Sequence, residues 1–309
     1  MSILDKINKG STIIVEIPII FHLIDPILLK EPSSFWQKYI NEKIITCLNK
    51  DFNVSYANYN NTLRQTINTL FADACPDKKK HYLNTINTLP TINNLKWIFT
   101  LHSIIIKPEN VFIRHDTNEH IFRITNVVDP ERFLNIIIAP GLRIMGLSVF
   151  PFDDRNPSNI SQINTKFAYR NAILINTCKF INTEHFRTFT HEIGHWCGLF
   201  HPFNNNRFRK SAIKKYALDK SPFNKAGGDL IKDTFPQTKP TFGRVNKNIR
   251  YANIFEKNNI TPNFFNFMDH THDSQMCMFT QCQMLQMLTL IDRFRPNLIN
   301  INSLNSLRT

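Results

Sequence analysis

The segment with the clearest chemistry in this 309-residue chain is 191–201, which has the form H-E-x-x-H-x-x-G-x-x-H. On a helix, His191 and His195 lie one turn apart on the same face, so both imidazoles can bind one zinc ion. Glu192 is then placed to reach a zinc-bound water as a general base. Gly198 can adopt a left-handed conformation and end the helix, after which the chain delivers His201 as a third nitrogen ligand. Three imidazoles with one open position are typical of a catalytic zinc site.

The alternative explanation of this segment is a core helix whose histidines are buried for packing alone. Three regularly spaced imidazoles and a carboxylate on one apolar surface would be costly to bury without a metal. The glycine and the third histidine also make a chance match far rarer than one to H-E-x-x-H alone. We therefore expect His191, His195 and His201 to bind zinc and Glu192 to be catalytic.

Two further segments lie downstream of the zinc motif. The first, at 227–236, carries Asp229 and Asp233, and the second, N-F-M-D-H at 266–270, carries Met268 and His270 and is followed by M-F-T-x-x-Q. The full zinc motif defines the metzincin metallopeptidases, which also place a methionine turn beneath the zinc. Taken together, the three segments resemble the pappalysin family of metzincins, and the resemblance extends over most of the chain.

This resemblance implies a zincin-like α/β (α+β) fold. It has a twisted mixed sheet and the active-site helix in an upper subdomain, and an irregular lower subdomain with the Met-turn and a C-terminal helix. The implied activity is that of a zinc metalloendopeptidase, a hydrolase that cleaves peptide bonds through a zinc-bound water with Glu192 as general base. Met268 would support the floor of the zinc site. The substrate would be an extended polypeptide beside an edge strand, either Gly146–Phe150 or Ala172–Asn176.

The chain departs from the family pattern in three places. Many relatives have tyrosine two residues after the turn methionine, where this chain has His270, which we expect to donate a hydrogen bond to the transition state. A family disulfide is missing, because no cysteine lies between Cys197 and Cys277. Several family members need calcium. Asp229 and Asp233 are candidate calcium ligands here, and capping of a turn explains them equally well.

Hydrophobic periodicity predicts the elements that position these residues. The expected strands are Ser11–Ile24, Leu95–Ile106, Phe133–Ala139, Gly146–Phe150 and Ala172–Asn176. The expected helices are Ser33–Asn49, Thr62–Ala74, Thr183–Cys197 and Gln281–Phe294. We expect a lead-in at 1–10, one catalytic domain at 11–295 and a loose tail at 296–309. Within the domain, the expected upper subdomain is 11–198 and the lower subdomain is 199–295.

The charge balance is strongly basic, with 37 Lys and Arg against 24 Asp and Glu and a formal net charge of +13. Much of this excess fits a lysine-rich codon bias spread over solvated faces. The sharpest local excess, at 203–225, is expected to favour acidic substrates. It lacks the alternation of aromatic and basic residues found in single-strand-binding surfaces, so nucleic acid is the weaker expectation as primary partner.

The six cysteines form no C-x-x-C pair, which argues against a structural zinc knuckle. The first residues lack the pattern of a secretory signal, so an intracellular or packaged protein, for example one in a virion, is expected rather than a secreted one. No apolar run is long enough to span a membrane. Two other functions remain open at this point: a catalytically weak or inactive zincin-fold binding module, and a basic nucleic-acid-binding protein.

Overall fold

A computed structural model describes residues 2–53, 94–107, 121, 125–142, 144–151, 171–181, 186–203, 228–229, 231, 234, 240–244 and 263–302. The chain divides into two compact units. The first contains Met1–Phe52, Asn94–Gly198 and Met287–Thr309, and the second contains Asn53–Asn93 and Leu199–Gln286. All described strands and the helix of the zinc motif belong to the first unit, whereas the expected methionine turn belongs to the second.

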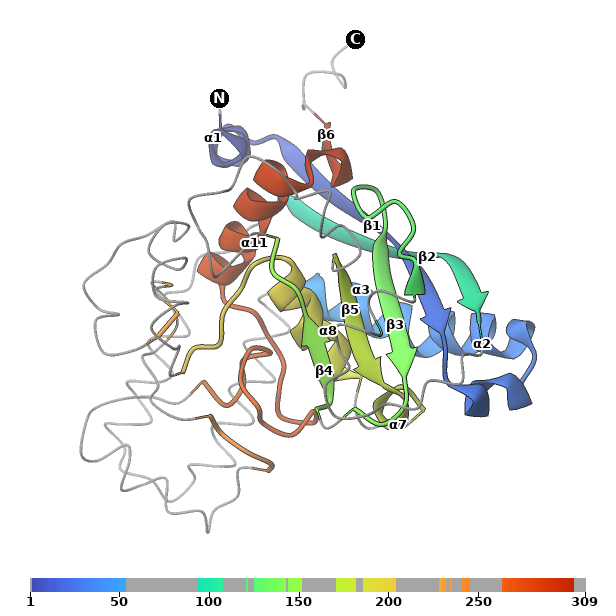
Figure 1. Ribbon diagram of the computed structural model, residues 1–309. Helices are drawn as coiled ribbons and strands as arrows, with labels where there is room; N and C mark the ends of the chain where they lie inside the picture. The colour runs from blue at the N-terminus through green and yellow to red at the C-terminus, as the bar shows by residue number, and fades with distance from the viewer. Residues whose placement is uncertain are drawn as a thin grey trace. The chain divides into compact units, whose positions relative to one another are not determined.

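The first unit is built on a mixed six-stranded sheet with the strand order β2-β1-β3-β5-β4, and β6 pairs with β1 (Figure 1). The strands are β1 (Thr12–Leu23), β2 (Leu95–Ile106), β3 (Leu134–Ala139), β4 (Gly146–Ser148), β5 (Ala172–Asn176) and β6 (Ile299–Asn302). Strands β1, β2, β3 and β5 are parallel, whereas β4 is antiparallel to β5 and β6 is antiparallel to β1. Among the described strands, β4 therefore forms one edge of the sheet.

The interior strands owe their position to continuous apolar runs. Every residue of β3 is buried, and so are the first four residues of β5. Such runs are typical of parallel strands covered on both faces. All five strands expected from the sequence are present, and their ends agree with the expected ones to within two residues.

A pair of polar side chains, His22 and Asn135, lies inside this apolar sheet. His22 of β1 is buried, and its Nε2 lies 2.8 Å from Oδ1 of Asn135 on the neighbouring β3. The Asn135 amide also donates to the carbonyls of Val128 and Phe133, and its Oδ1 accepts from the Val128 N–H. Burial lowers the pKa of His22, although its contact with Asn135 acts in the opposite direction. The imidazole is therefore held in its neutral form.

The helical stretch expected at Ser33–Asn49 is present, but it is not a single α-helix. It consists of α2 (Ser33–Tyr39), the π-helical segment η2 (Ile40–Ile45) and α3 (Thr46–Phe52). The Trp36 indole N–H donates to the carbonyl of Leu28 at 2.8 Å, which fixes the start of this stretch. Two short helices precede it: α1 (Ile3–Asn8) within the expected lead-in, and the 3-10 helix η1 (Pro26–Lys30).

Helix α8 (Arg187–Trp196) carries the zinc motif and packs against β4 and β5. It follows the short helix α7 (Thr177–Phe180), and an aromatic cluster lies beneath both helices. In this cluster Phe21 of β1 lies 6.3 Å, between ring centroids, from both Phe180 and Phe189. The helix was expected to begin at Thr183, but residues 182–185 lie outside the described part of the chain.

Helix α11 (Gln281–Phe294) has the predicted bounds, and its N-terminus is capped by its own sequence. The Thr280 hydroxyl accepts from the Gln283 N–H at 3.2 Å, while Gln283 Oε1 accepts from the Thr280 N–H at 2.8 Å. This is the reciprocal pattern of a capping box. Within the described residues, no helix has the length and apolar character needed to cross a membrane.

The expectation of a loose tail after Pro296 is wrong for the residues that follow α11. They form the 3-10 helix η5 (Pro296–Leu298) and then β6, which pairs with β1 from Thr12 to Val15. This strand, of alternating isoleucines and asparagines, pairs with the first part of β1 on the edge opposite β2, a part that β3 does not reach. A four-residue strand gives too short a pattern to be recognised without its distant partner.

The described part of the second unit is mostly irregular, as the resemblance implied. Outside α11 its regular pairing consists of two isolated bridges, Gly243 with Thr271 and Asn266 with Met278. The helix expected at Thr62–Ala74 lies outside the described residues.

Candidate metal centre and active site

Helix α8 presents the first histidine pair of the motif. His191 and His195 are both buried, and their Nε2 atoms lie 3.1 Å apart. The two rings are nearly perpendicular, at 86°, and the Phe150 ring packs edge-on against His195 at 5.5 Å. The helical spacing predicted from the sequence thus brings these two nitrogens together in the first unit.

Glu192 lies against the edge strand of the sheet. A Cβ atom on Gly146 of β4 would lie 2.7 Å from Glu192 Cγ and 2.8 Å from its Oε1, so only glycine leaves room for this carboxylate. Burial raises the pKa of Glu192 to about 8. A carboxylate with a raised pKa can both accept and return a proton near neutral pH, which is what a general base needs.

Gly198 ends α8 as expected. Its φ of +100° is in the left-handed region, and its N–H donates to the His195 carbonyl at 2.8 Å. A side chain here would also collide with Leu290 of α11. After this sharp end of the helix, only Leu199 and Phe200 lie between Gly198 and His201.

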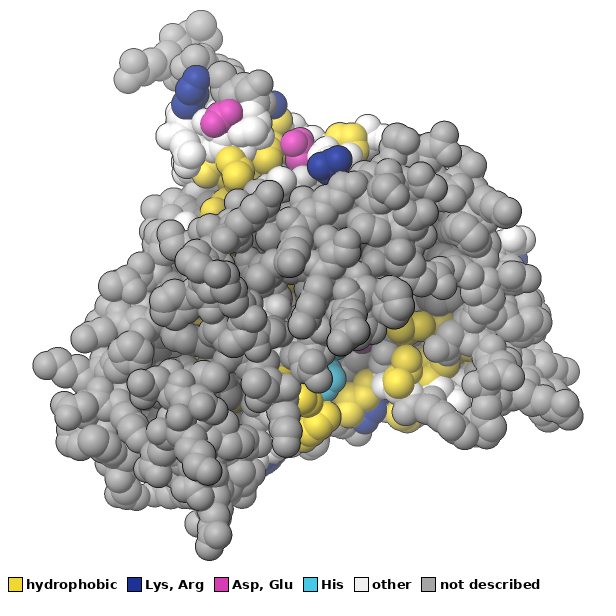
Figure 2. All heavy atoms as spheres, turned by 60° about the vertical axis from the view of Figure 1, so that its left-hand side comes forward, with side chains coloured by type: hydrophobic (Ala, Val, Ile, Leu, Met, Phe, Trp, Pro, Cys, Tyr) yellow, Lys and Arg dark blue, Asp and Glu magenta, His cyan; other side chains and the backbone are white. Residues whose placement is uncertain are grey.

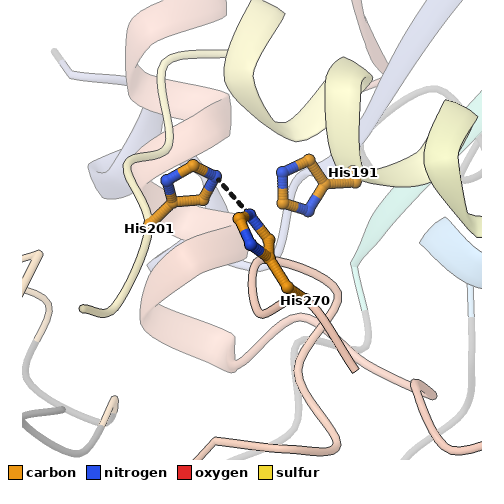
Figure 3. Close-up of side chains that lie close together, drawn as sticks. All are labelled: His191, His201 and His270. Carbon is orange, nitrogen blue, oxygen red and sulfur yellow. Dashed lines mark hydrogen bonds between the residues drawn. The ribbon is translucent and has the colours of Figure 1, made fainter. Parts of the chain in front are cut away.

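The second unit contains the second histidine pair, His201 with His270. Their Nε2 atoms lie 3.4 Å apart and their rings are nearly perpendicular, at 85°. The dashed line in Figure 3 marks this contact. Phe203 stacks on His201 with a centroid distance of 4.7 Å. Burial lowers the pKa of His270, which keeps this imidazole neutral. In the space-filling view, histidine atoms reach the surface beside hydrophobic side chains (Figure 2).

The methionine turn is held by side-chain amides. Asn266 Oδ1 accepts from the Met268 N–H at 2.9 Å, and the Asn266 amide donates to Gln283 Oε1 at 2.8 Å. Met268 itself is fully buried. Gln283 therefore serves the turn and the cap of α11 with the same oxygen atom.

A buried carboxylate fixes the residue that follows the turn. Asp269 Oδ1 accepts from the backbone N–H of His270 at 2.8 Å and from that of Thr241 at 2.9 Å. The adjacent Thr271 forms a bridge with Gly243. The loop that carries His270 is thus tied to the segment 240–244.

The imidazole donors fit a zinc ion. Two nitrogens on one tetrahedral zinc are about 3.3–3.4 Å apart, because each Zn–N distance is about 2.0–2.1 Å. The His191–His195 and His201–His270 pairs, at 3.1 and 3.4 Å, are both close to this separation. His191, His201 and His270 each offer one nitrogen suited to a metal. The chemistry of the donor set therefore matches the cofactor that the motif predicts.

Asp229 acts in the structure as a turn cap. Its buried Oδ1 accepts from the Ile231 N–H at 3.1 Å and from the Thr234 hydroxyl at 2.5 Å. This agrees with the turn-capping explanation, and calcium binding stays a prediction. Asp233 lies outside the described residues, as does the basic segment 203–225 except for Phe203. No disulfide joins any two of the five described cysteines.

Two polar clusters that hold the ends of α8 were not predicted. At its N-terminal end, Asp51 of α3 pairs with Arg187 and accepts from the Thr190 hydroxyl at 2.6 Å. At its C-terminal end, Arg295 donates to the Trp196 carbonyl at 3.2 Å and to Asn171 Oδ1 at 2.6 Å. Neither Asp51 nor Arg295 lies in the three segments on which the family resemblance rests.

Comparison with known proteins identifies the class. Residues 115–292, more than half of the chain, match the model of the peptidase M43 family, described as pregnancy-associated plasma protein-A. The chain therefore belongs to this family of metzincin zinc metallopeptidases, the pappalysins.

Individual proteins are also similar to this chain. The chain is 27% identical over 322 residues to the uncharacterised protein R722 of Acanthamoeba polyphaga mimivirus, covering 95% of this chain and 34% of R722. It is 27% identical over 162 residues to an extracellular metalloprotease of Arthroderma benhamiae, covering 52% of this chain and 48% of that protein. The chain thus spans about a third to a half of the length of these relatives.

A solved structure shares the fold. Mature mirolysin of Tannerella forsythia, in complex with a cleaved peptide, superposes with a TM-score of 0.56 at 19% identity, covering 92% of this chain and 95% of mirolysin. The zincin-like mixed α/β fold expected from the sequence is confirmed.

Proposed function

We propose that this chain is a zinc-dependent endopeptidase in which His191, His195 and His201 bind the metal and Glu192 is the general base. The observation that carries the proposal is the fit of Glu192, next to the histidine pair of α8, against the glycine of an edge strand. Membership of the M43 family supports the same activity.

In the proposed reaction, a bound zinc ion would lower the pKa of a water molecule to about 7 and polarise the scissile carbonyl. Glu192 accepts the proton of the attacking water and then donates it to the leaving amine. The buried position of this carboxylate keeps bulk water away from the transferred proton. Met268, which is buried in its own turn, supports the floor of the site.

The proposed substrate is a polypeptide in an extended conformation. Strand β4 pairs with β5 on one side, and its other edge can accept an additional strand. Of the two strands expected at this edge, β4 occupies it and β5 lies inside the sheet. A preference for acidic substrates rests on the charge of 203–225, and reversing the charges of Lys214 and Lys215 should then change the cleavage preference.

The test compares the wild type with Glu192→Ala and with Glu42→Ala, a change of an exposed glutamate on η2, as matched control. Zinc content and cleavage of a mixed peptide library are measured for each. We expect one zinc per chain in all three proteins, and cleavage by the wild type and the control only. Full cleavage by Glu192→Ala would refute the mechanism. Zinc without any cleavage of peptides or of denatured protein would instead support the zincin-fold binding module.

A further inference from the structure

Phe242 is the most exposed large hydrophobic residue in the described part of the chain. It is 68% exposed, and the next highest value is 54%, at Met145. Single exposed apolar side chains are common on protein surfaces, so exposure alone does not indicate a site. Phe242 differs because its backbone is held on both sides and its ring contacts a histidine of the second unit.

The residues on either side of Phe242 fix its backbone. The Thr241 N–H donates to the buried Asp269 at 2.9 Å, and Gly243 forms a bridge with Thr271. Gly243 has a φ of +68°, in the left-handed region that favours glycine, although a Cβ atom there would meet nothing within 4 Å. The glycine therefore serves the backbone conformation and not a close contact. A ring presented from such a fixed backbone loses little conformational entropy when it binds a ligand.

The Phe242 ring lies beside the two histidines of the second unit. Its centroid is 5.5 Å from that of His270, and the His270 ring is 4.8 Å from that of His201, a proposed metal ligand. The buried Phe203 packs against both imidazoles, at 4.7 and 4.9 Å. All four rings belong to the second unit, so this arrangement is internal to it. Phe242 is thus the exposed member of an aromatic cluster that contains a proposed metal ligand.

The exposed ring determines which ligand chemistry fits. A phenyl ring offers apolar area and a π-face, which suit an aromatic or a large aliphatic side chain. A π-face also attracts cations. The exposed Arg244, two residues further along, and the formal net charge of +13 act against a cationic side chain. An apolar ligand side chain is therefore favoured over a basic one.

Building on the proposed function, we propose that Phe242 is a specificity-determining residue of the peptidase. Its ring receives an aromatic or large aliphatic side chain of the substrate close to the cleaved bond. Consecutive residues of an extended peptide are about 3.3 Å apart, so the two ring-to-ring steps from His201 to Phe242 correspond to a few substrate residues. This selectivity is separate from the acidic preference expected from 203–225.

The test uses the zinc-loaded full chain and peptides that differ at one position near the cleaved bond, occupied by phenylalanine, leucine, serine or lysine. The variants are Phe242→Ala and Phe242→Leu. Phe35→Ala, a change of another exposed phenylalanine that lies on α2 in the first unit, is the matched control. Fluorescence anisotropy of the same peptides with Glu192→Ala, and with Glu192→Ala combined with Phe242→Ala, measures binding without turnover.

We expect the wild type and Phe35→Ala to cleave the phenylalanine and leucine peptides with a kcat/KM about 10-fold above that for the serine peptide. In Phe242→Ala this ratio should fall to near one, whereas Phe242→Leu should keep part of it. Anisotropy should show the same preference in Glu192→Ala and its loss in the double variant. Zinc content should be equal in all the proteins, because Phe242 is not a metal ligand.

Two results would overturn the inference and leave the proposed function intact. One is cleavage by the wild type without an apolar preference or with a preference for lysine, and the other is an unchanged ratio in Phe242→Ala. Absence of cleavage, combined with phenylalanine-selective binding that depends on Phe242, would overturn the proposed peptidase activity alone. A chain that neither cleaves nor binds these peptides would overturn both.

Discussion

The two ends of α8 are held by arginines that lie in opposite electrostatic surroundings. At the N-terminal end, Arg187 pairs with the buried carboxylate of Asp51, so positive and negative charge cancel. At the C-terminal end, the described partners of Arg295 are neutral: the Trp196 carbonyl, Asn171 and the face of the Trp196 indole at 3.8 Å. Burial lowers the pKa of Arg295 to about 10.

The helix dipole explains this difference. A cation is unfavourable at a helix N-terminus and favourable at a C-terminus. Arg187 therefore needs a counter-ion, whereas Arg295 is stabilised by the last carbonyls of α8 and by the negative face of an indole. Helix α8 is therefore fixed by compensated charge at one end and by its own dipole at the other.

The strongest way to break this arrangement is Asp51→Ala, which leaves Arg187 without its counter-ion. We expect the free energy of unfolding to fall by about 3–5 kcal/mol, measured by urea denaturation. Asp129→Ala, which breaks the exposed pair with Arg132, should cost less than about 1 kcal/mol. If charge compensation is the cause, Asp51→Leu combined with Arg187→Met should recover most of the loss. A double variant as unstable as Asp51→Ala would contradict this explanation.

A substitution that disturbs the middle of α8 should lower activity rather than stability. Gly146→Ala places a Cβ 2.7 Å from the present position of Glu192 Cγ, and the flexible glutamate must move away. Because displacement of a catalytic group by about 1 Å can cost 100-fold, we expect kcat to fall roughly 100-fold. Zinc content and thermal stability should change little. Ser148→Ala on the same strand is the control, and an unchanged kcat in Gly146→Ala would show that the carboxylate has room.

At the C-terminal end, Arg295→Met should lower the free energy of unfolding by about 2 kcal/mol, because two hydrogen bonds and the contact with the indole are lost. Arg295→Lys should be at least as harmful, since it keeps a buried charge but lacks the planar group that stacks on Trp196. The exposed Arg293→Met serves as control and should stay within about 0.5 kcal/mol of wild type. Full stability of Arg295→Lys would mean that charge alone holds this end.

The smallest expected effect on stability comes from the sheet and not from the two ends of α8. Burial lowers the pKa of His22 below its ordinary 6.5, so the unfolded chain binds more protons than the folded chain in this range. The contribution of His22 is complete above pH 6.5 and is lost as the pH decreases through its folded pKa. In His22→Gln, the free energy of unfolding between pH 7 and 5 should vary less steeply, whereas Arg295→Met should keep the wild-type slope. Equal slopes in His22→Gln and wild type would rule out His22 as the titrating group.

Local signals in the sequence predicted much of this fold and site. Helical spacing placed His191 and His195 together, and apolar runs located the strands. The contacts that hold α8 were not predictable, because Arg295 and Trp196 are 99 residues apart in sequence and Asp51 and Thr190 are 139 apart. The π-helical segment at Ile40–Ile45 also has no local signature, since its apolar spacing equals that of an ordinary helix.

The discontinuous first unit has a consequence for the order of events during synthesis. Its third segment begins at Met287, so Arg295 and β6 leave the ribosome after the proposed metal ligands and the proposed general base have been made. Until then, the C-terminal end of α8 lacks its arginine, and β1 is paired over Ile13–Val15 with β2 but not with β6. A nascent chain would therefore carry all the proposed catalytic groups before its first unit is complete. If the proposed function is right, peptidase activity is expected only after translation has passed the last strand.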